Sequence, residues 1–219
     1  MNKIIVSLFS LGITLVGTES VALEKPEYEV LHADGKIEYR LYNAYVVAET
    51  AVKASDGYSG ASNEGFRRLF RYITGANAGE TDIAMTAPVQ MSMPSSGEKI
   101  DMTAPVQSSL QGENLNVAFM LPSQFSFESA PQPTDGRVVI KKMPPRMMAV
   151  IRYSGRWTEA NREKYAFRLQ DYLSQNGVVP VSGPESAAYN APFTPPFMRR
   201  NEIMFEINDF PGMAVDEDA

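Results

Sequence analysis

The nine residues DIAMTAPVQ at Asp82–Gln90 recur as KIDMTAPVQ at Lys99–Gln107, a spacing of 17 residues. Between the copies lies Pro94–Gly97, whose proline, serines and glycine favour a turn. The repeat therefore predicts a hairpin with two nearly identical extended arms. Because proline cannot donate a hydrogen bond to a neighbouring strand, Pro88 and Pro105 restrict each arm to an edge or irregular strand.

The segment before the repeat shows helical periodicity. Within Phe66–Ile73, apolar side chains recur at positions i, i+3, i+4 and i+7, which is the pattern of an amphipathic helix. Ser59 or Ser62 is suited to cap its first turn, because a serine hydroxyl accepts hydrogen bonds from free backbone N–H groups. Gly75 is suited to end it in a left-handed conformation.

The second half of the chain repeats the order of the first. A second amphipathic pattern predicts a helix over Glu159–Asn176, capped by Thr158 and closed by Gly177. The order strands, helix, strands therefore occurs twice, which predicts one α+β domain of two related halves around a largely antiparallel sheet. Strand periodicity is present over Tyr28–His32, Lys36–Tyr42, Ala44–Val52, Leu115–Leu121, Arg137–Lys142, Met147–Tyr153 and Asn201–Ile207.

The N-terminus has the form of a secretory signal peptide. Lys3 precedes an apolar run, and small residues follow up to a cleavage position after Ala22. The run is shorter than the roughly 20 residues of a membrane span, although an uncleaved anchor is an alternative. We therefore expect residues 1–22 to be a signal peptide, residues 23–210 to form the domain and residues 211–219 to be a flexible acidic tail. The expected location is periplasmic or secreted, without a stable membrane span after cleavage.

Composition excludes several classes of function. The net charge is −6 and no run of Lys or Arg resembles a nucleic-acid footprint. The chain has no cysteine, so it has neither disulfides nor a thiolate nucleophile or metal ligand. A single histidine, without metal-ligand spacing or a phosphate-binding glycine loop, gives no support for hydrolytic, metal or nucleotide chemistry. The sequence favours a binding protein over an enzyme and leaves the oligomeric state open.

Four motifs together resemble the SOUL heme-binding protein family. They are the doubled Ile-x-Met-Thr-Ala-Pro-Val, Phe66–Gly75 (FRRLFRYITG), Tyr153–Trp157 (YSGRW) and Tyr189–Glu202 (YNAPFTPPFMRRNE). The likeness covers about residues 27–207. It implies a distorted antiparallel β-barrel flanked by two α-helices, with pseudo-twofold halves. It also implies binding of heme or a related tetrapyrrole as a small-molecule ligand.

The resemblance also implies a location for the ligand. In the family, the apolar face of the first helix and its adjoining loops are thought to form a flat slot. Carried onto this chain, that slot involves Phe66, Phe70 and Arg71, with Leu69 and Ile73 nearby. Arg67 or Arg71 would pair with a propionate. The alternative is that the apolar stripe is buried in the protein's own core and the arginines are solvated.

No axial ligand of the heme iron stands out. His32 is the only histidine and lies beside a predicted turn, where an exposed, unligated side chain is the alternative. Methionine thioether also binds heme iron, and Met85 and Met102 recur in the repeat, but methionine is mostly a flexible core filler. Family members that hold heme mainly by apolar contact make an axial ligand optional. The cluster Arg199–Glu202 either faces a bound anion or forms a structural ion-pair knot.

The leading interpretation is therefore an exported protein that binds heme or another tetrapyrrole for capture, buffering or transfer. A carrier or sensor of other hydrophobic molecules is a second interpretation, since the expected barrel resembles small-molecule-binding domains of bacterial drug-response regulators. A tetrapyrrole-modifying enzyme and a protein-interaction module are the remaining alternatives.

Overall fold

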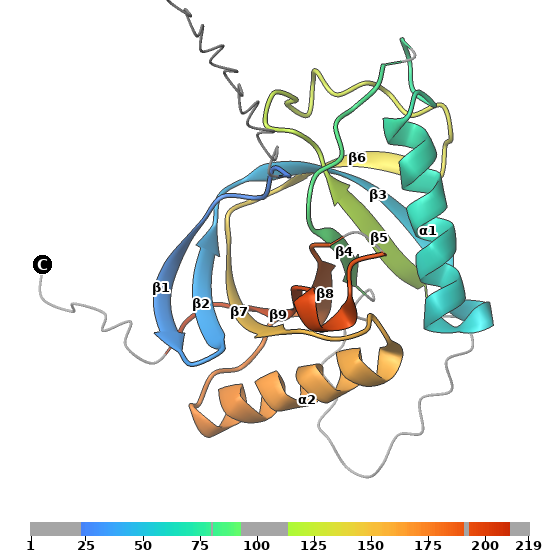
Figure 1. Ribbon diagram of the computed structural model, residues 1–219. Helices are drawn as coiled ribbons and strands as arrows, with labels where there is room; N and C mark the ends of the chain where they lie inside the picture. The colour runs from blue at the N-terminus through green and yellow to red at the C-terminus, as the bar shows by residue number, and fades with distance from the viewer. Residues whose placement is uncertain (1–22, 80, 93–113, 191–192, 211–219) are drawn as a thin grey trace, which may run out of the picture.

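The computed structural model describes residues 23–79, 81–92, 114–190 and 193–210. The predicted signal peptide, the predicted acidic tail and the second copy of the repeat with Met102 lie outside these residues. The described residues form an α+β fold in which a nine-stranded antiparallel sheet curls into a distorted barrel (Figure 1). The predicted fold class is confirmed.

Two helices and nine strands make up the fold. The helices are α1 (Gly57–Ile73) and α2 (Glu159–Gln175), each 17 residues long, and short 3-10 turns occur at η1 (Ala54–Asp56) and η2 (Pro196–Met198). The strands are β1 (Tyr28–Asp34), β2 (Ile37–Tyr42), β3 (Tyr45–Lys53), β4 (Val89–Ser92), β5 (Asn114–Met120), β6 (Val138–Met143), β7 (Arg146–Tyr153), β8 (Glu185–Ala188) and β9 (Asn201–Ile207).

The strand order gives the two halves of the barrel. It runs β1-β2-β7-β9-β8-β4-β5-β3-β6, with β8 and β4 paired at the centre. On one side of this pair lie β9, β7 and β2, and on the other lie β5, β3 and β6. Strand β2 of the first half thus flanks β7 of the second, while β6 of the second half flanks β3 of the first. This exchange is what a pseudo-twofold axis between β4 and β8 requires.

Each helix covers the outer surface of its own half (Figure 1). Leu69 of α1 is fully buried in a cluster with Val117 and Phe119 of β5. Leu169 of α2 is fully buried in a cluster with Ile203 of β9. The opposite face of the sheet is enclosed by the curl and carries a third cluster, made of Tyr42, Ala87, Met148, Val150, Ala187, Tyr189 and Met204. We call this enclosed surface the inner face.

The start of α1 differs from the prediction. The helix begins at Gly57, so neither Ser59 nor Ser62 caps it, and Ser62 instead donates a 2.7 Å hydrogen bond to the carbonyl of Tyr58. The helix extends further because Tyr58 and Ala61 are buried against the sheet, so tertiary packing outweighs the local capping signal. Helix α2 begins as predicted, with Thr158 accepting a hydrogen bond from the Asn161 N–H.

The first copy of the repeat is irregular through Pro88, in agreement with one of the two alternatives, and the strand that follows is not an edge strand. Strand β4 starts at Val89 and pairs with both β5 and β8, so it lies inside the sheet. The sheet tolerates Pro88 because this residue precedes the strand and no ladder hydrogen bond is lost. The prediction for the second arm falls outside the described residues.

Candidate functional site

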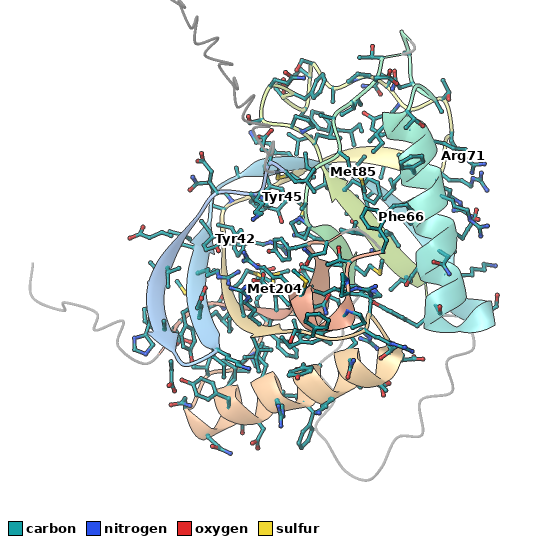
Figure 2. All side chains as sticks on the ribbon, viewed as in Figure 1. Tyr42, Tyr45, Phe66, Arg71, Met85 and Met204 are labelled. Atoms are coloured by element: carbon teal, nitrogen blue, oxygen red, sulfur yellow. The ribbon has the colours of Figure 1, made fainter. Side chains whose placement is uncertain are left out.

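Helix α1 carries an aromatic pair at its surface. The rings of Phe66 and Phe70 stack with centroids 6.0 Å apart and planes inclined by 12°, and Phe66 also meets the edge of Phe119 at 5.3 Å. Phe66 is half-buried, whereas Phe70 is 45% exposed. Figure 2 shows Phe66 directed from α1 toward the sheet, with Arg71 on the outer side of the helix. The pair presents a flat apolar surface that is anchored on one side by the core.

Cations flank this surface. Arg67 lies 3.4 Å from Glu64 and is well exposed, while Arg71 is exposed and has no ion pair within the described part of the chain. Arg68 is largely buried and donates a 2.9 Å hydrogen bond to Glu64. This hydrogen bond lowers the pKa of the Glu64 carboxyl. Three arginines against one glutamate give α1 a net charge of +2. Arg67 and Arg71 are therefore available to a ligand's carboxylates, whereas Arg68 is not.

The other residues predicted for the slot are less accessible. Leu69 and Ile73 are enclosed in the core beneath α1. Met85 is half-buried and packs against the same cluster as Phe66, close to the end of α1 in Figure 2. Met102 lies outside the described residues. The structure therefore brings Phe66 and Phe70 together, places Met85 against the same core cluster as Phe66, and assigns Leu69 and Ile73 to packing.

His32 lies far from α1. It is exposed on β1, where its ring faces Tyr39 at 6.0 Å and Phe210 at 6.4 Å. Strand β1 is one edge of the sheet, whereas α1 packs over β3 and β5 near the other edge (Figure 1). A ligand on α1 therefore cannot use His32 of the same chain. Among the described residues, no group of three or more His, Cys, Asp or Glu side chains is arranged to hold a metal ion.

The pseudo-equivalent helix α2 gives an internal comparison. Aligning the buried Leu69 with Leu169 places Tyr72 on Tyr172 and Ile73 on Leu173. At these three positions, in the last turns of the helices, the residues that face the sheet are the same or similar. The surface residues differ, since Phe66, Arg67, Phe70 and Arg71 correspond to Ala166, Phe167, Gln170 and Asp171. With three acidic and three basic residues, α2 has no net charge.

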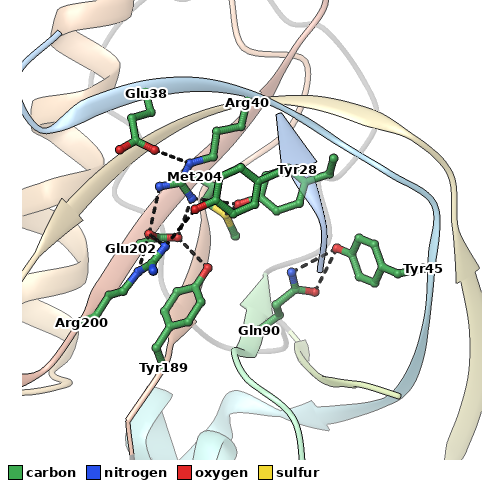
Figure 3. A network of polar contacts seen from close by, with 10 residues as sticks. Tyr28, Glu38, Arg40, Tyr45, Gln90, Tyr189, Arg200, Glu202 and Met204 are labelled. Carbon is green, nitrogen blue, oxygen red and sulfur yellow. Dashed lines mark hydrogen bonds and ion pairs between the residues drawn. The ribbon is translucent and has the colours of Figure 1, made fainter. Parts of the chain in front are cut away.

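A buried ion-pair network fills part of the inner face (Figure 3). Arg40 is 1% exposed and makes two hydrogen bonds of 3.0 and 3.1 Å to Glu202, which is completely buried. Glu202 also accepts hydrogen bonds from Tyr189 at 2.7 Å and from Arg200 at 2.7 Å. Glu38 accepts a 2.6 Å hydrogen bond from Nε of Arg40. The hypothesis of a structural knot at Arg199–Glu202 agrees with this arrangement.

The protonation states of the network follow from its geometry. Burial raises the pKa of the Glu202 carboxyl, but the hydrogen bonds and charges of Arg40 and Arg200 overcome this and hold it below its usual value. Burial and the charge of Glu202 raise the pKa of Tyr189 well above its usual value. Glu202 is therefore ionised and Tyr189 neutral at pH 7. The charge of Glu202 is therefore balanced by arginines of the protein itself.

A second polar group lies on the inner face beside β4 and β8. Arg146 makes two hydrogen bonds of 2.6 and 2.9 Å to Glu185 and one of 3.1 Å to Tyr45, which also contacts Gln90 at 3.1 Å. Burial disfavours its charge, but Glu185 and Tyr45 raise the pKa of Arg146 above its usual value. The adjacent cavity measures only about 40 Å³, too small for a tetrapyrrole. The inner face is thus largely filled by the protein's own side chains.

Residues 23–206 match the SOUL heme-binding protein family over most of the chain. The chain belongs to the SOUL heme-binding protein family. The predicted resemblance is confirmed.

Two known proteins are similar to this chain over almost the same extent. Heme-binding protein 1 of Xenopus laevis is 27% identical over 192 residues, which cover 87% of this chain and 86% of that protein. Heme-binding protein 2 of Mus musculus is 25% identical over 194 residues, covering 85% and 87%. Among solved structures, the C-terminal domain of EcmrR has a TM-score of 0.54 at 12% identity, covering 83% of this chain and 98% of that domain. That likeness concerns the fold alone.

Proposed function

We propose that this SOUL-family protein binds heme or a related tetrapyrrole on the exposed side of α1, as an exported protein for capture, buffering or transfer. The family and the two heme-binding relatives support the ligand class. The stacked pair Phe66 and Phe70, flanked by Arg67 and Arg71, supports the location. A tetrapyrrole combines a flat apolar ring with carboxylates, and this surface offers a complement to both.

The residues of this surface fit a tetrapyrrole held by contact. The Phe70 ring would lie against the macrocycle, and Phe66 would keep Phe70 in place. Arg67 and Arg71 would pair with propionates as exposed ions. Met85 is half-buried against the core cluster and His32 lies on the distant edge strand β1, so neither is assigned as an axial ligand in this proposal. The ligand supplies the iron and its redox chemistry, and this chain would supply binding and orientation.

The comparison of α1 with α2 is the observation that carries the proposal. Two halves with one architecture need similar packing residues, and the last turns of α1 and α2 share them at Leu69 and Leu169, Tyr72 and Tyr172, and Ile73 and Leu173. Phe70, Arg67 and Arg71 are exposed and have no such requirement, yet α1 has an aromatic pair and a net charge of +2. Its counterpart has Ala166, Phe167, Gln170 and Asp171 at these positions, a single phenylalanine and no net charge. A specialised ligand surface on one helix explains this asymmetry.

A hemin titration followed by absorbance tests the proposal. The protein starting at Leu23 should bind hemin saturably, and Phe70→Ala or Arg71→Ala should each weaken binding about tenfold, which is about 1.4 kcal/mol. Gln170→Ala and Asp171→Ala on α2 are the matched controls and should leave the affinity unchanged. The absence of saturable binding in the unsubstituted protein would contradict the proposal.

A carrier of other flat molecules is the second candidate, and the lack of an evident axial ligand among the described residues favours it. An unrelated flat dye without propionates distinguishes the two, because it should compete equally well with hemin only for a general carrier. Metal-free protoporphyrin IX tests the role of the iron. If the surface recognises ring and carboxylates, protoporphyrin should compete with hemin at similar concentration. If an iron ligand matters, it should compete at least tenfold worse. Recovery of unchanged tetrapyrrole after long incubation is expected of a binding protein, whereas a converted product would indicate an enzyme.

Export is a separate part of the proposal and rests on the N-terminal sequence. No helix in the described part of the chain is long and apolar enough to cross a membrane. Cell fractionation of the full chain should place a product shortened to Leu23 outside the cytoplasm. A full-length product in the cytoplasmic fraction would contradict export and leave the binding proposal intact.

A further inference from the structure

An open groove lies at one end of the inner face, away from α1. Its volume is about 430 Å³, within the range of about 300 to 1,000 Å³ that is usual for small-molecule sites. We call it the rim groove. It is lined by Gly35, Lys36, Glu38, Arg152, Tyr153, Ser154, Phe197, Met198 and Arg199.

Three segments that are distant in sequence build the rim groove. The β1–β2 turn and the end of β7 are joined by a 3.1 Å hydrogen bond from the Arg152 N–H to the Lys36 carbonyl. The segment containing η2 is held against the end of β7 by a 2.9 Å hydrogen bond from the Gly155 N–H to the Pro196 carbonyl. Strands β2 and β7 lie side by side in Figure 1, so the groove has a sheet floor and an η2 wall. Backbone hydrogen bonds therefore fix its shape.

The rim groove is cationic on a protein of net charge −6. Lys36, Arg152 and Arg199 line it against one carboxylate, Glu38. Glu38 is already bonded to the buried Arg40 at 2.6 Å, which reduces its effect on the groove. Lys36 and Arg152 have no ion pair in the part of the chain that the structure describes. The groove therefore favours an anionic ligand.

Apolar side chains stand at the same groove. Phe197 is 78% exposed and Met198 is 63% exposed, and both lie on η2. Large apolar side chains with this exposure, side by side next to cations, are typical of a surface that receives a partner with an apolar part. Phe197 is suited to cover a flat ring, and Met198 adapts its shape because its side chain is unbranched.

We propose that the rim groove is a second ligand site, which binds an amphipathic aromatic anion independently of the tetrapyrrole surface on α1. The aromatic part of the ligand packs under Phe197 and Met198. Its carboxylate or sulfonate faces Lys36 and Arg152. The two sites share no residue, since α1 packs over β3 and β5 whereas the groove lies on β2, β7 and η2.

Fluorescence titration with 1-pyrenebutyrate tests this site. The protein starting at Leu23 should bind the probe saturably and should bind the uncharged analogue 1-pyrenebutanol at least tenfold more weakly. Arg152→Ala and Phe197→Ala should each weaken pyrenebutyrate binding about tenfold. Both side chains are exposed, so the variants should fold normally. Lys142→Ala on β6 and Phe167→Ala on α2, where Phe167 is 71% exposed, are the matched controls and should bind like the unsubstituted protein.

Equal losses in the groove variants and their controls, or no loss in either, would overturn the proposal. So would equal affinity for the charged and uncharged probes. Hemin titration of the same variants separates the two sites. If Arg152→Ala and Phe197→Ala keep hemin affinity, the sites are independent. If they lose hemin affinity while Phe70→Ala keeps it, the tetrapyrrole binds in the groove. The assignment of the tetrapyrrole to α1 and the independence of the two sites would then both be wrong.

Discussion

Helices α1 and α2 have the same length and equivalent positions in the fold, but they are used differently. Both bury a leucine completely, Leu69 and Leu169, against equivalent strands. On its outward side, α1 has an aromatic pair among arginines. Its net charge is +2, whereas the net charge of α2 is zero. A pseudo-symmetric chain therefore contains its own control. What both helices keep is needed for packing, and what only one has is a candidate for function.

The two helices also differ in depth of burial. Helix α1 buries seven residues, while α2 buries only Leu169 and Leu173. Part of the reason is that the loop after β5 closes over α1, where Tyr72 donates a 2.8 Å hydrogen bond to the Pro131 carbonyl. Gly65 allows close packing, because a Cβ atom there would lie only 2.4 Å from Val117. Helix α1 is therefore a rigid support, which suits a surface that must hold a flat ligand.

The largest expected effect concerns the interior that both halves share. Glu202→Gln should lower the free energy of unfolding by about 3 to 5 kcal/mol, because it leaves Arg40 and Arg200 without their buried carboxylate. Chemical denaturation at pH 7 measures the loss. Glu206→Gln on the same strand, at a half-buried position, is the control. Hemin affinity of the folded variant should not change, and a parallel loss of affinity would show that the inner face takes part in binding.

Acidification should also lower the free energy of unfolding, without any mutation. The folded-state pKa of Glu202 is held below its unfolded-state value of about 4.3. Its stabilising contribution is therefore complete above that value and is lost as the pH falls through the folded-state pKa. Denaturation between pH 7 and pH 3 should show a steeper loss for the natural protein than for Glu202→Gln. Parallel curves would mean that Glu202 is not the responsible group.

Next in size is the effect of cavities beneath the two helices. Leu69→Ala and Leu169→Ala should each destabilise the protein by about 2 to 5 kcal/mol, since both side chains are fully buried. Thermal or chemical unfolding gives the two values. Similar losses would support the equivalence of the helices. A loss below about 1 kcal/mol at one of them would break it.

Salt should have a smaller effect on hemin affinity, and it should act only through the arginines of α1. Arg67 and Arg71 are exposed, so their attraction to propionates is screened as the Debye length falls from about 10 Å at 0.1 M to about 3 Å at 1 M salt. Hemin affinity should fall about threefold over this range. Arg71→Gln should reduce that dependence, and Asp171→Asn on α2 should not. Identical salt dependence in all three proteins would remove the arginines from the account.

The smallest effect is expected at the only histidine. His32→Ala should change hemin affinity by less than about twofold, because β1 and α1 lie on different sides of the molecule. Absorbance titration suffices, since loss of an imidazole ligand would also alter the heme spectrum. A large loss would place the ligand at the β1–β2 turn.

Much of this fold could be predicted from the sequence. Strands with apolar alternation, such as β2 and β9, and the cap of α2 at Thr158 follow from local rules. Strand β8 was not predicted, because Glu185–Ala188 contains no β-branched or aromatic residue and is a strand only by pairing with β4 and β9. Its position is set by tertiary contacts.

The candidate sites were less predictable for the same reason. Helical periodicity identified the stripe containing Phe66, Leu69, Phe70 and Ile73, but it could not tell which edge of the stripe stays exposed. The pairing of Arg40 with Glu202 joins residues 162 positions apart, and the rim groove joins three distant segments. Only the strand order brings these side chains together. The cationic and aromatic composition of Phe193–Arg200 is a clue to the rim groove in the sequence, but the same residues belong to the family motif.

The most direct test of the central claim replaces two surface residues of α1 by their counterparts in α2 and measures hemin binding. Phe70→Gln with Arg71→Asp gives α1 the residues of α2, and both positions are exposed, so the fold should persist. The account predicts at least a tenfold loss of hemin affinity for this variant. It predicts no loss for Gln170→Ala with Asp171→Ala. Unchanged hemin affinity in the exchanged α1 variant, with folding intact, would contradict the assignment of the ligand to α1.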